Sequence, residues 1–154
     1  MRVMVALALG GNSGDVRTHF NRVLSALEVA GVSGIRMSSI YVTAPVDCPP
    51  GSADFLNAAL TGYCSIPPLE LLALCKELER KAGRPAHYPP NSPRPLDIDI
   101  ILYGDLVYSD ASLTIPHPRA AVRRFVLDPL AEIAPDLIFP DSGLTVRELA
   151  DRLG

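Results

Sequence analysis

The sequence contains only three cysteines, Cys48, Cys64 and Cys75, and no CxxC pair. Because the number of cysteines is odd and none are paired in spacing, the sequence suggests neither a disulfide framework nor a zinc site. The first apolar run, residues 3–9, is far shorter than the roughly 20 residues of a membrane-spanning helix. It also lacks a convincing cleavage site of small residues. We therefore expect no membrane span, no signal peptide and a cytoplasmic location.

The sequence also lacks the glycine-rich phosphate loops of common nucleotide-binding folds. The turn at residues 10–15 (GGNSGD) matches neither GxGxxG nor the Gly-Lys-Ser/Thr end of a P-loop, so its phosphate signal is weak. The formal net charge is −3, which argues against a general nucleic-acid-binding protein. Without an internal repeat or linker, the 154 residues predict a single domain, residues 1–154, with a full core.

Lysine is scarce, because 12 of the 14 basic residues are arginine. Arginine makes planar, two-pronged contacts with phosphate groups, whereas lysine acts as a point charge. The basic residues form two clusters: Lys76, Arg80, Lys81, Arg84 and Arg94, and then Arg119, Arg123 and Arg124. Ordinary basic helix surfaces explain such clusters, but the acidic pair described next favours a phosphate ligand.

The chain is organised around residues 96–104 (LDIDIILYG), which read as one buried strand. Alternation along a strand predicts a core face made of Leu96, Ile98, Ile100 and Leu102. Asp97 and Asp99 share the other face, about 7 Å apart, where they can bind one or two hard cations. Mg²⁺ takes one or two protein carboxylates, and phosphates and water fill its remaining positions. Charges that only block edge pairing are the alternative, but Ile101 and Tyr103 on the same face argue against it.

The apolar patterning predicts the element order β-α-β-β-α-β with a helical tail. Strands are expected over residues 3–9, 35–43, 55–64 and 96–104, with a short one at 106–108, and helices over 15–30 and 67–82. Residues 125–130 lead into a short helix, and a capping box of Thr145 and Glu148 starts the last one. With both long helices on one face of an antiparallel sheet, the fold is a ferredoxin-like α+β sandwich.

Several polar positions leave alternatives open. Asn57 lies among apolar neighbours, where its amide serves either the backbone or the edge of a bound heterocycle. His117 is held between two prolines and is either structural or catalytic. Glu79 and its neighbours Lys76 and Arg80 are expected on the outer side of their helix. The proline-rich loop 84–95 leads into the acidic strand, so we expect a lid or wall over the site.

Residues 93–100 (PRPLDIDI) resemble the signature PRxLDLDI of the 6-hydroxymethyl-7,8-dihydropterin pyrophosphokinases, a family of folate synthesis. Further resemblance follows in the family's order along nearly the whole chain, at residues 9–12 (LGGN), 55–59 (FLNAA), 115–117 (IPH) and 125–135. The resemblance implies that ATP and the pterin bind together. The pterin hydroxymethyl oxygen then attacks the β-phosphorus of ATP, a diphosphate is transferred, and AMP leaves.

The resemblance also implies a role for individual residues. Asp97 and Asp99 would hold two Mg²⁺ ions against the triphosphate and, with Arg94 and Arg84, make up the catalytic set. The implied pterin pocket comprises Thr43, Phe55, Asn57, Asp97 and Phe125. The implied ATP contacts are Lys76, Glu79, Arg94, Ile100, Thr114, His117 and Arg123.

This chain departs from the family pattern before the signature. Members commonly have Arg-Trp-Gly-Pro-Arg where residues 90–94 read PNSPR, and Pro118 stands where tyrosine often follows the histidine. We hypothesise that Arg84, Arg119 or Arg124 replaces the missing arginine. Unchanged turnover after alanine replacement of each would exclude this.

Two other function classes compete with an active enzyme. One is a catalytically impaired member that binds ATP or pterin as a regulatory or scaffold protein. The other is a plain ferredoxin-like binding module, which leaves the acidic pair and the arginine clusters unexplained. We expect a monomer whose partners are ATP and the pterin, with no nucleic acid or membrane.

Overall fold

The computed structural model of the chain describes all residues except 1, 46–49 and 84–93. Its main elements are β1 (Val3–Gly11), α1 (Val16–Val29), β2 (Ser33–Met37), β3 (Tyr41–Thr43), β4 (Phe55–Cys64), α2 (Pro68–Lys81), β5 (Asp97–Tyr103), α3 (Arg124–Ile133) and α4 (Val146–Arg152). The shorter ones are β6 (Tyr108–Ser109), β7 (Thr114–Ile115), a 3-10 turn (Ala120–Val122), β8 (Ile138–Phe139) and β9 (Leu144–Thr145). None of the helices in these described residues is both long and apolar enough to span a membrane.

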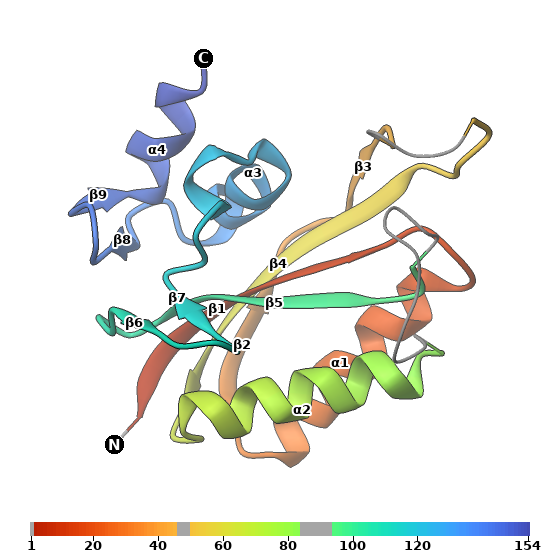
Figure 1. The fold of residues 1–154 in the computed structure, drawn as a ribbon, viewed down its shortest axis with the longest axis horizontal. Helices are drawn as coiled ribbons and strands as arrows, with labels where there is room; N and C mark the ends of the chain where they lie inside the picture. The colour runs from red at the N-terminus through yellow and green to blue at the C-terminus, as the bar shows by residue number, and fades with distance from the viewer. Residues whose placement is uncertain (1, 46–49, 84–93) are drawn as a thin grey trace.

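One antiparallel sheet forms the centre of the molecule, with strand order β2-β4-β1-β5 and β3 also paired to β4. Helices α1 and α2 cover one face of this sheet, and α3 and α4 lie on the other (Figure 1). This order of strands and helices confirms the predicted ferredoxin-like α+β fold with a helical tail.

The central strand β1 contributes to two hydrophobic cores, as its continuous apolar run predicts. Leu7 packs with Phe20 of α1 and Leu71 of α2 in the core on one face of the sheet. Ala6 packs on the opposite face, in a core that contains Leu127 of α3. The prediction that residues 3–9 are buried on both faces is confirmed.

Both helices on the first face begin and end where the sequence predicts. The Asp15 carboxylate caps α1 by accepting a hydrogen bond from the Thr18 amide at 3.2 Å. Pro68 occupies the first turn of α2, where its missing N–H costs nothing. Gly31 and Gly83 follow the two helices with φ angles of 101° and 104°, which favour glycine.

The strand expected over residues 35–43 is wrong in one respect, because the structure divides it into β2 and β3. Ser38 lies at the break and is buried. Its amide donates to the Ala59 carbonyl at 2.8 Å, and its hydroxyl accepts from the Ala59 amide at 2.9 Å. A side-chain oxygen therefore replaces a backbone carbonyl in the ladder and ends the regular pairing.

The predicted face of Leu102 is also wrong, because β5 contains a bulge. Leu7 pairs with Ile100 and Ala6 pairs with Leu102, so Ile101 is the extra residue. Ile101 and Leu102 both enter the core beneath α3, whereas Leu96, Ile98 and Ile100 face α1 and α2 as predicted. The bulge lies beyond Asp99 and leaves the alternation of the acidic pair intact.

Two shorter predictions need correction, and one holds. The strand expected at residues 106–108 is observed at Tyr108–Ser109, where it pairs with β7. Residues 125–130 do not lead into a helix but lie inside α3, which begins at Arg124 and includes Pro129. The capping box of Thr145 and Glu148 is present at the start of α4.

Helix α3 is fastened to the β2–β3 segment by the Glu132 carboxylate. It accepts hydrogen bonds from the Ser39 amide at 2.8 Å, the Ser39 hydroxyl at 2.6 Å and the Tyr41 hydroxyl at 2.8 Å. These bonds, led by the Ser39 hydroxyl, hold the pKa of Glu132 below its ordinary value. The ionised carboxylate is therefore the form that the fold favours.

We expect Glu132→Gln to lower the free energy of unfolding at pH 7 by about 1 kcal/mol, since water screens this exposed group. Because folding lowers its pKa, the stabilisation is present above the ordinary value of 4.5 and is lost as the pH falls through the folded value. Urea unfolding of both proteins at pH 7 and at falling pH measures this difference. Glu28→Gln, on an exposed turn of α1, is the control. A gap between Glu132→Gln and wild type that widens in acid would contradict the prediction.

Candidate functional site

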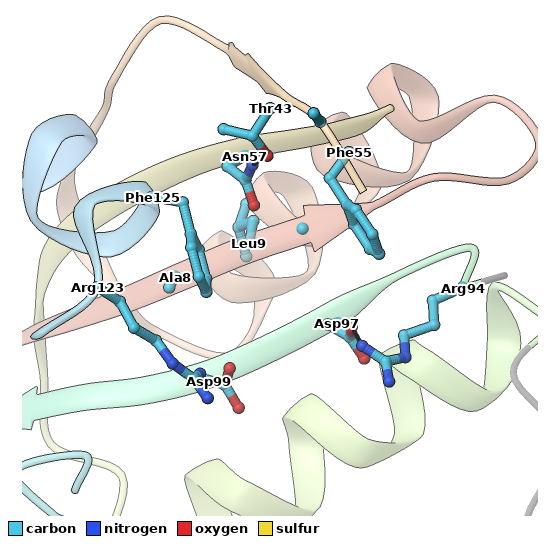
Figure 2. Close-up of a pocket in the computed structure, with 12 residues that line it drawn as sticks. Ala8, Leu9, Thr43, Phe55, Asn57, Arg94, Asp97, Asp99, Arg123 and Phe125 are labelled. Atoms are coloured by element: carbon cyan, nitrogen blue, oxygen red, sulfur yellow. Dashed lines mark hydrogen bonds and ion pairs between the residues drawn. The ribbon is translucent and has the colours of Figure 1, made fainter. Parts of the chain in front are cut away.

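A cavity of about 300 Å³ opens on the face of the sheet that carries Asp97 and Asp99 (Figure 2). Its walls come from five parts of the chain: β1, β3, β4, the start of α3, and the Arg94–Asp99 segment of β5 and its approach. The lining residues are Ala8, Leu9, Gly10, Thr43, Ala44, Phe55, Asn57, Arg94, Asp97, Asp99, Arg123 and Phe125. We call it the first cavity.

A second cavity of about 240 Å³ lies farther along β5, between α2 and the segment that contains β7. Its lining residues are Leu72, Lys76, Ile98, Asp99, Ile100, Asp110, Ala111, Ser112, Leu113, Thr114, His117 and Pro118. Asp99 belongs to both linings, so one carboxylate stands at the boundary of the two spaces. Ligands in the two cavities would meet at this side chain.

The acidic pair lies as the strand alternation predicts. Asp97 and Asp99 both line the first cavity, while Ile98 between them is buried in the core beneath the helices. Asp99 is exposed, and Asp97 forms an ion pair with the Arg94 guanidinium, N to O 3.6 Å. Two carboxylates and an arginine thus occupy one edge of the cavity.

Asp97 and Asp99 suit a cation for which the protein supplies only some of the ligands. In the stretches that the structure describes, no three His, Cys, Asp or Glu side chains gather into a metal-binding group. Asp97 and Asp99 provide hard oxygen donors, and Mg²⁺ completes its octahedral shell with phosphate oxygens and water. The donor set therefore fits Mg²⁺ held jointly by the protein and a phosphate ligand.

Two aromatic rings stand on either side of the first cavity. Figure 2 shows Phe55, at the start of β4, and Phe125, in the first turn of α3, with the acidic strand running below them. The Arg123 guanidinium lies over the Phe125 ring, 5.4 Å from its centroid. A flat ring system entering between Phe55 and Phe125 would find an aromatic face on each side.

Asn57 contributes a buried amide to the same cavity. Its side chain is 6% exposed, and its Nδ2 donates to the Thr43 hydroxyl at 2.8 Å. A Cβ on Gly10 would come within 3.3 Å of Asn57 Oδ1, so the glycine leaves room for the amide. The structure thus places Asn57 and Thr43 together at the wall, where sequence reasoning left a backbone role open.

His117 lines the second cavity with its imidazole fixed by local bonds. Its amide donates to the Ile101 carbonyl at 3.0 Å, and its Nδ1 accepts from the Arg119 amide at 3.3 Å. Burial lowers the pKa of His117, with Arg123 and Arg119 acting in the same direction and Asp99 opposing them. The ring is therefore neutral near pH 7, and its Nε2 carries the proton.

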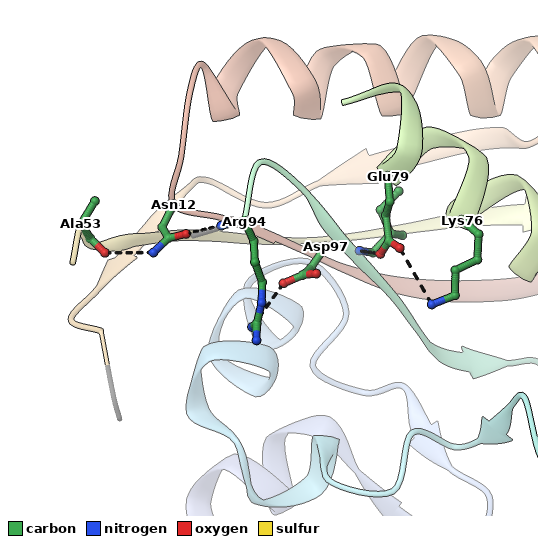
Figure 3. Close-up of polar contacts among 7 residues, drawn as sticks. Asn12, Ala53, Lys76, Glu79, Arg94 and Asp97 are labelled. Carbon is green, nitrogen blue, oxygen red and sulfur yellow. Dashed lines mark hydrogen bonds and ion pairs between the residues drawn. The ribbon is translucent and has the colours of Figure 1, made fainter. Parts of the chain in front are cut away.

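Glu79 does not lie on the outer side of α2 as expected, and it is absent from both cavity linings. It follows Cys75 by one helical turn and is 4% exposed beneath β5. Its Oε2 accepts from the Ile98 amide at 2.8 Å, and its Oε1 lies 3.8 Å from Lys76 Nζ (Figure 3). Because β5 is an edge strand, the carboxylate satisfies an amide that has no neighbouring strand.

The same buried region keeps Cys75 protonated. Burial first, and then the charges of Glu79 and Asp99, raise the pKa of the Cys75 thiol to about 12. Cys64 and Cys75 are both buried and free. These two cysteines serve packing rather than chemistry.

We expect Glu79→Ala to lower the free energy of unfolding by about 2–4 kcal/mol, because it leaves the buried Ile98 amide unsatisfied and a void beneath β5. Glu77→Ala, two residues away on a solvent-exposed pair with Arg80, is the matched control and should cost much less than Glu79→Ala. Urea denaturation measures both variants. Equal losses for the two would contradict the structural role of Glu79.

The five arginines that the sequence named as candidate phosphate contacts or replacements divide into three groups. Arg94 and Arg123 line the first cavity. Arg124 instead contacts Asp128 at 3.4 Å and the Gly154 carbonyl, and neither Arg124 nor Arg119 lines the first or the second cavity. Arg84 and most of the lid or wall expected over residues 84–95 lie outside the described residues, which resume at Arg94.

Sequence reasoning missed the part of the wall that comes from β1. Ala8 and Gly10 line the first cavity on the strand that runs beneath it. The available signal is a run of small residues, Ala6, Ala8 and Gly10, at alternate positions of an otherwise aliphatic strand. In the second cavity, Asp110 and Ser112 were likewise missed, and no local pattern indicates them.

Comparisons with known proteins agree in pointing to one family. A family model described as 7,8-dihydro-6-hydroxymethylpterin-pyrophosphokinase (HPPK) matches residues 6–135. A 2-amino-4-hydroxy-6-hydroxymethyldihydropteridine pyrophosphokinase of Synechocystis is 40% identical over 148 residues, covering 96% of this chain and 74% of the relative. A protein of the same name from Bacillus subtilis is 39% identical over 134 residues, covering 86% of this chain and 79% of the relative.

The solved structures agree with the fold. An HPPK-DHPS of Plasmodium falciparum, crystallised with pteroate, is similar at a TM-score of 0.74 and 15% identity. The match covers 99% of this chain and 42% of that one, so the chain spans about two fifths of that protein. At this identity the likeness shows the fold alone.

Proposed function

The chain belongs to the 7,8-dihydro-6-hydroxymethylpterin-pyrophosphokinase family, and we propose that it transfers a diphosphate from ATP to the hydroxymethyl group of 6-hydroxymethyl-7,8-dihydropterin. AMP is the second product, and the reaction belongs to folate biosynthesis. The observation that carries the proposal is the position of Asp99 at the boundary of two adjacent cavities, because two substrates must meet there for direct transfer.

The first cavity suits the pterin. Phe55 and Phe125 offer ring faces for stacking, which provides contact area. The Asn57 amide, with Thr43 beside it, offers a donor and an acceptor for the heterocycle edge, which provides selection. The hydroxymethyl arm would then extend toward Asp97 and Asp99.

The second cavity suits ATP. Ile100 and Thr114 line it where an adenine would lie, with Lys76 and His117 placed for the phosphates. The phosphate chain would run past Asp99 toward Arg94 and Arg123, which line the first cavity. The positive charge of these arginines complements the triphosphate.

Asp97 and Asp99 would hold two Mg²⁺ ions. When bound, such ions would supply positive charge that offsets the negative charge developing during transfer. Glu79 lies behind β5 and supports this strand rather than the nucleotide. The ion pair of Arg94 with Asp97 keeps an arginine at the place where the transferred phosphates would pass.

The chemistry asks little covalent work of the protein. The hydroxymethyl oxygen forms a bond to the β-phosphorus, the bond from that phosphorus to the α–β bridging oxygen breaks, and AMP departs with that oxygen. The hydroxyl proton passes to solvent. The reaction is accelerated mainly by aligning the two substrates and by neutralising charge. The two adjoining cavities would provide both.

The experiment that tests this proposal measures AMP release from ATP and Mg²⁺ with and without 6-hydroxymethyl-7,8-dihydropterin. We expect AMP only when the pterin is present. Tight MgATP binding without AMP would instead favour a binding-only member of the family. The sequence departures from the family pattern, at residues 90–94 and at Pro118 in the second cavity lining, are the features that favour this second candidate.

We also propose that the 154 residues act as one domain and as a monomer. The two hydrophobic cores pack on the two faces of one central sheet, which supports a single domain. A cytoplasmic location accords with the free cysteines, and a net charge of −3 accords with the absence of a nucleic-acid partner. Sedimentation of the protein with both ligands tests the assembly state, and a stable dimer would contradict it.

A further inference from the structure

Asn12, in the turn between β1 and α1, holds a residue 82 positions away in the chain. Its side chain is 9% exposed, and its Oδ1 accepts from the Arg94 amide at 2.7 Å. The Asn12 and Ser13 amides both donate to the Arg94 carbonyl, at 2.8 and 3.2 Å. The turn therefore forms hydrogen bonds with both the amide and the carbonyl of Arg94, and Figure 3 shows Asn12 beside the Arg94 backbone.

The other end of the Asn12 amide is also engaged. Its Nδ2 donates to the Ala53 carbonyl at 3.3 Å, two residues before Phe55 begins β4 (Figure 3). One side chain therefore connects the approach to β5 with the approach to β4. These two approaches carry Arg94 and Phe55, which both line the first cavity.

Gly11, the residue before Asn12, shows that β1 packs closely against the approach to β5. A Cβ on Gly11 would lie 2.6 Å from the Pro95 carbonyl oxygen, closer than non-bonded atoms tolerate. The end of β1 thus packs directly on the Arg94–Pro95 backbone. With the backbone held on two sides, the Arg94 guanidinium is left to reach Asp97 at 3.6 Å.

We propose that Asn12 is a positioning residue of the diphosphate transfer, an inference that rests on the proposed function. Asn12 is not part of either cavity lining, so it can act on the reaction only through its neighbours. Its turn makes three hydrogen bonds to the Arg94 backbone and one longer bond to Ala53, so we assign its effect to Arg94. By fixing the Arg94 backbone it sets where the guanidinium stands relative to Asp97 and to the passing phosphates. A guanidinium misplaced by a fraction of its own size loses much of its effect on a developing charge.

A purely structural role for Asn12 makes a different prediction. A residue that only closes a turn would lower stability and would harm the enzyme independently of Arg94. A residue that acts through Arg94 has no further function to lose once that side chain is gone. A double-mutant cycle separates the two cases.

The test measures kcat, the KM for the pterin and thermal stability of wild type, Asn12→Ala, Arg94→Ala and the double variant. We expect each single change to lower kcat by about 10–100-fold. The double variant should lie within about threefold of Arg94→Ala alone, with the pterin KM of Asn12→Ala changed by less than about threefold. Ser13→Ala, in the same turn, keeps the backbone bond to Arg94 and is the matched control, expected to retain wild-type kcat.

Two further variants keep the test decisive. Asn12→Asp loses the bond to the Ala53 carbonyl, because it places an oxygen there, but it retains an acceptor for the Arg94 amide. Because the bond to Arg94 is the one that matters for positioning, Asn12→Asp should keep a higher kcat than Asn12→Ala. If Asn12→Ala does not fold, Asn12→Ser, which leaves a polar group in the turn, takes its place in the cycle.

Losses that multiply in the double variant, or wild-type kcat in Asn12→Ala, would overturn the positioning role while leaving the proposed function intact. A wild-type protein that releases no AMP would overturn the proposed function itself, and the role of Asn12 with it.

Discussion

Replacing Asp99 with alanine is expected to lower the turnover of AMP release by about 10³-fold or more. Asp99 is the carboxylate that lines both cavities, so its loss would remove a metal ligand at the place where the two substrates are proposed to meet. Asp97→Ala should cause a similar loss and in addition deprives the Arg94 guanidinium of its partner at 3.6 Å. Turnover at saturating ATP, pterin and Mg²⁺ measures both effects.

A matched control lies on the turn that follows the same strand. Asp105 is exposed and is absent from both cavity linings. Asp105→Ala should keep wild-type turnover, and all three variants should unfold near the wild-type temperature because none of these carboxylates is buried. An Asp99→Ala protein that keeps more than about a tenth of wild-type turnover would contradict the metal-binding role.

Replacing Asn57 with leucine, which is similar in size, is expected to raise the dissociation constant of the pterin by about 10²-fold. The buried amide at the cavity wall is the group placed to recognise the heterocycle edge, and leucine leaves those ring polar atoms unpaired. The dissociation constant of MgATP should stay within about threefold of wild type, because Asn57 does not line the second cavity. Calorimetric titration of each ligand gives the two constants.

Thr43→Val is the control for this prediction. It keeps the shape of the side chain and removes only the hydroxyl that accepts from Asn57 Nδ2 at 2.8 Å. We expect a smaller loss of pterin affinity, about 3–10-fold, since the amide stays in place. If Asn57→Leu weakens MgATP as much as the pterin, the assignment of the first cavity to the pterin is wrong.

Much of the fold follows from periodicity in the sequence. Residues 55–64 form β4 with the predicted bounds, and α1 and α2 end at the glycines that the sequence places there. The acidic pair could be placed on one face because strand alternation holds from Leu96 to Ile100. The resemblance to the pyrophosphokinases, carried by residues 93–100, agrees with the matched family.

The features that sequence reasoning missed depend on contacts between distant segments. The bulge at Ile101 arises from the pairing of β5 with β1, and no residue type within β5 predicts it. Glu79 looks like an exposed helix residue until the β5 edge places the Ile98 amide against it. The hydrogen bond between the Asn12 side chain and the Arg94 amide joins two segments that are distant in the sequence and meet only in the folded sheet.

Phosphorus-31 NMR of the reaction mixture tests the central claim most directly. With ATP, Mg²⁺, 6-hydroxymethyl-7,8-dihydropterin and the protein, we expect the three ATP signals to be replaced by one AMP signal and by two mutually coupled signals of a pterin diphosphate ester. The two products should form in equal amounts. A single phosphate ester signal accompanied by ADP, or AMP accompanied by free diphosphate, would contradict diphosphate transfer to the pterin.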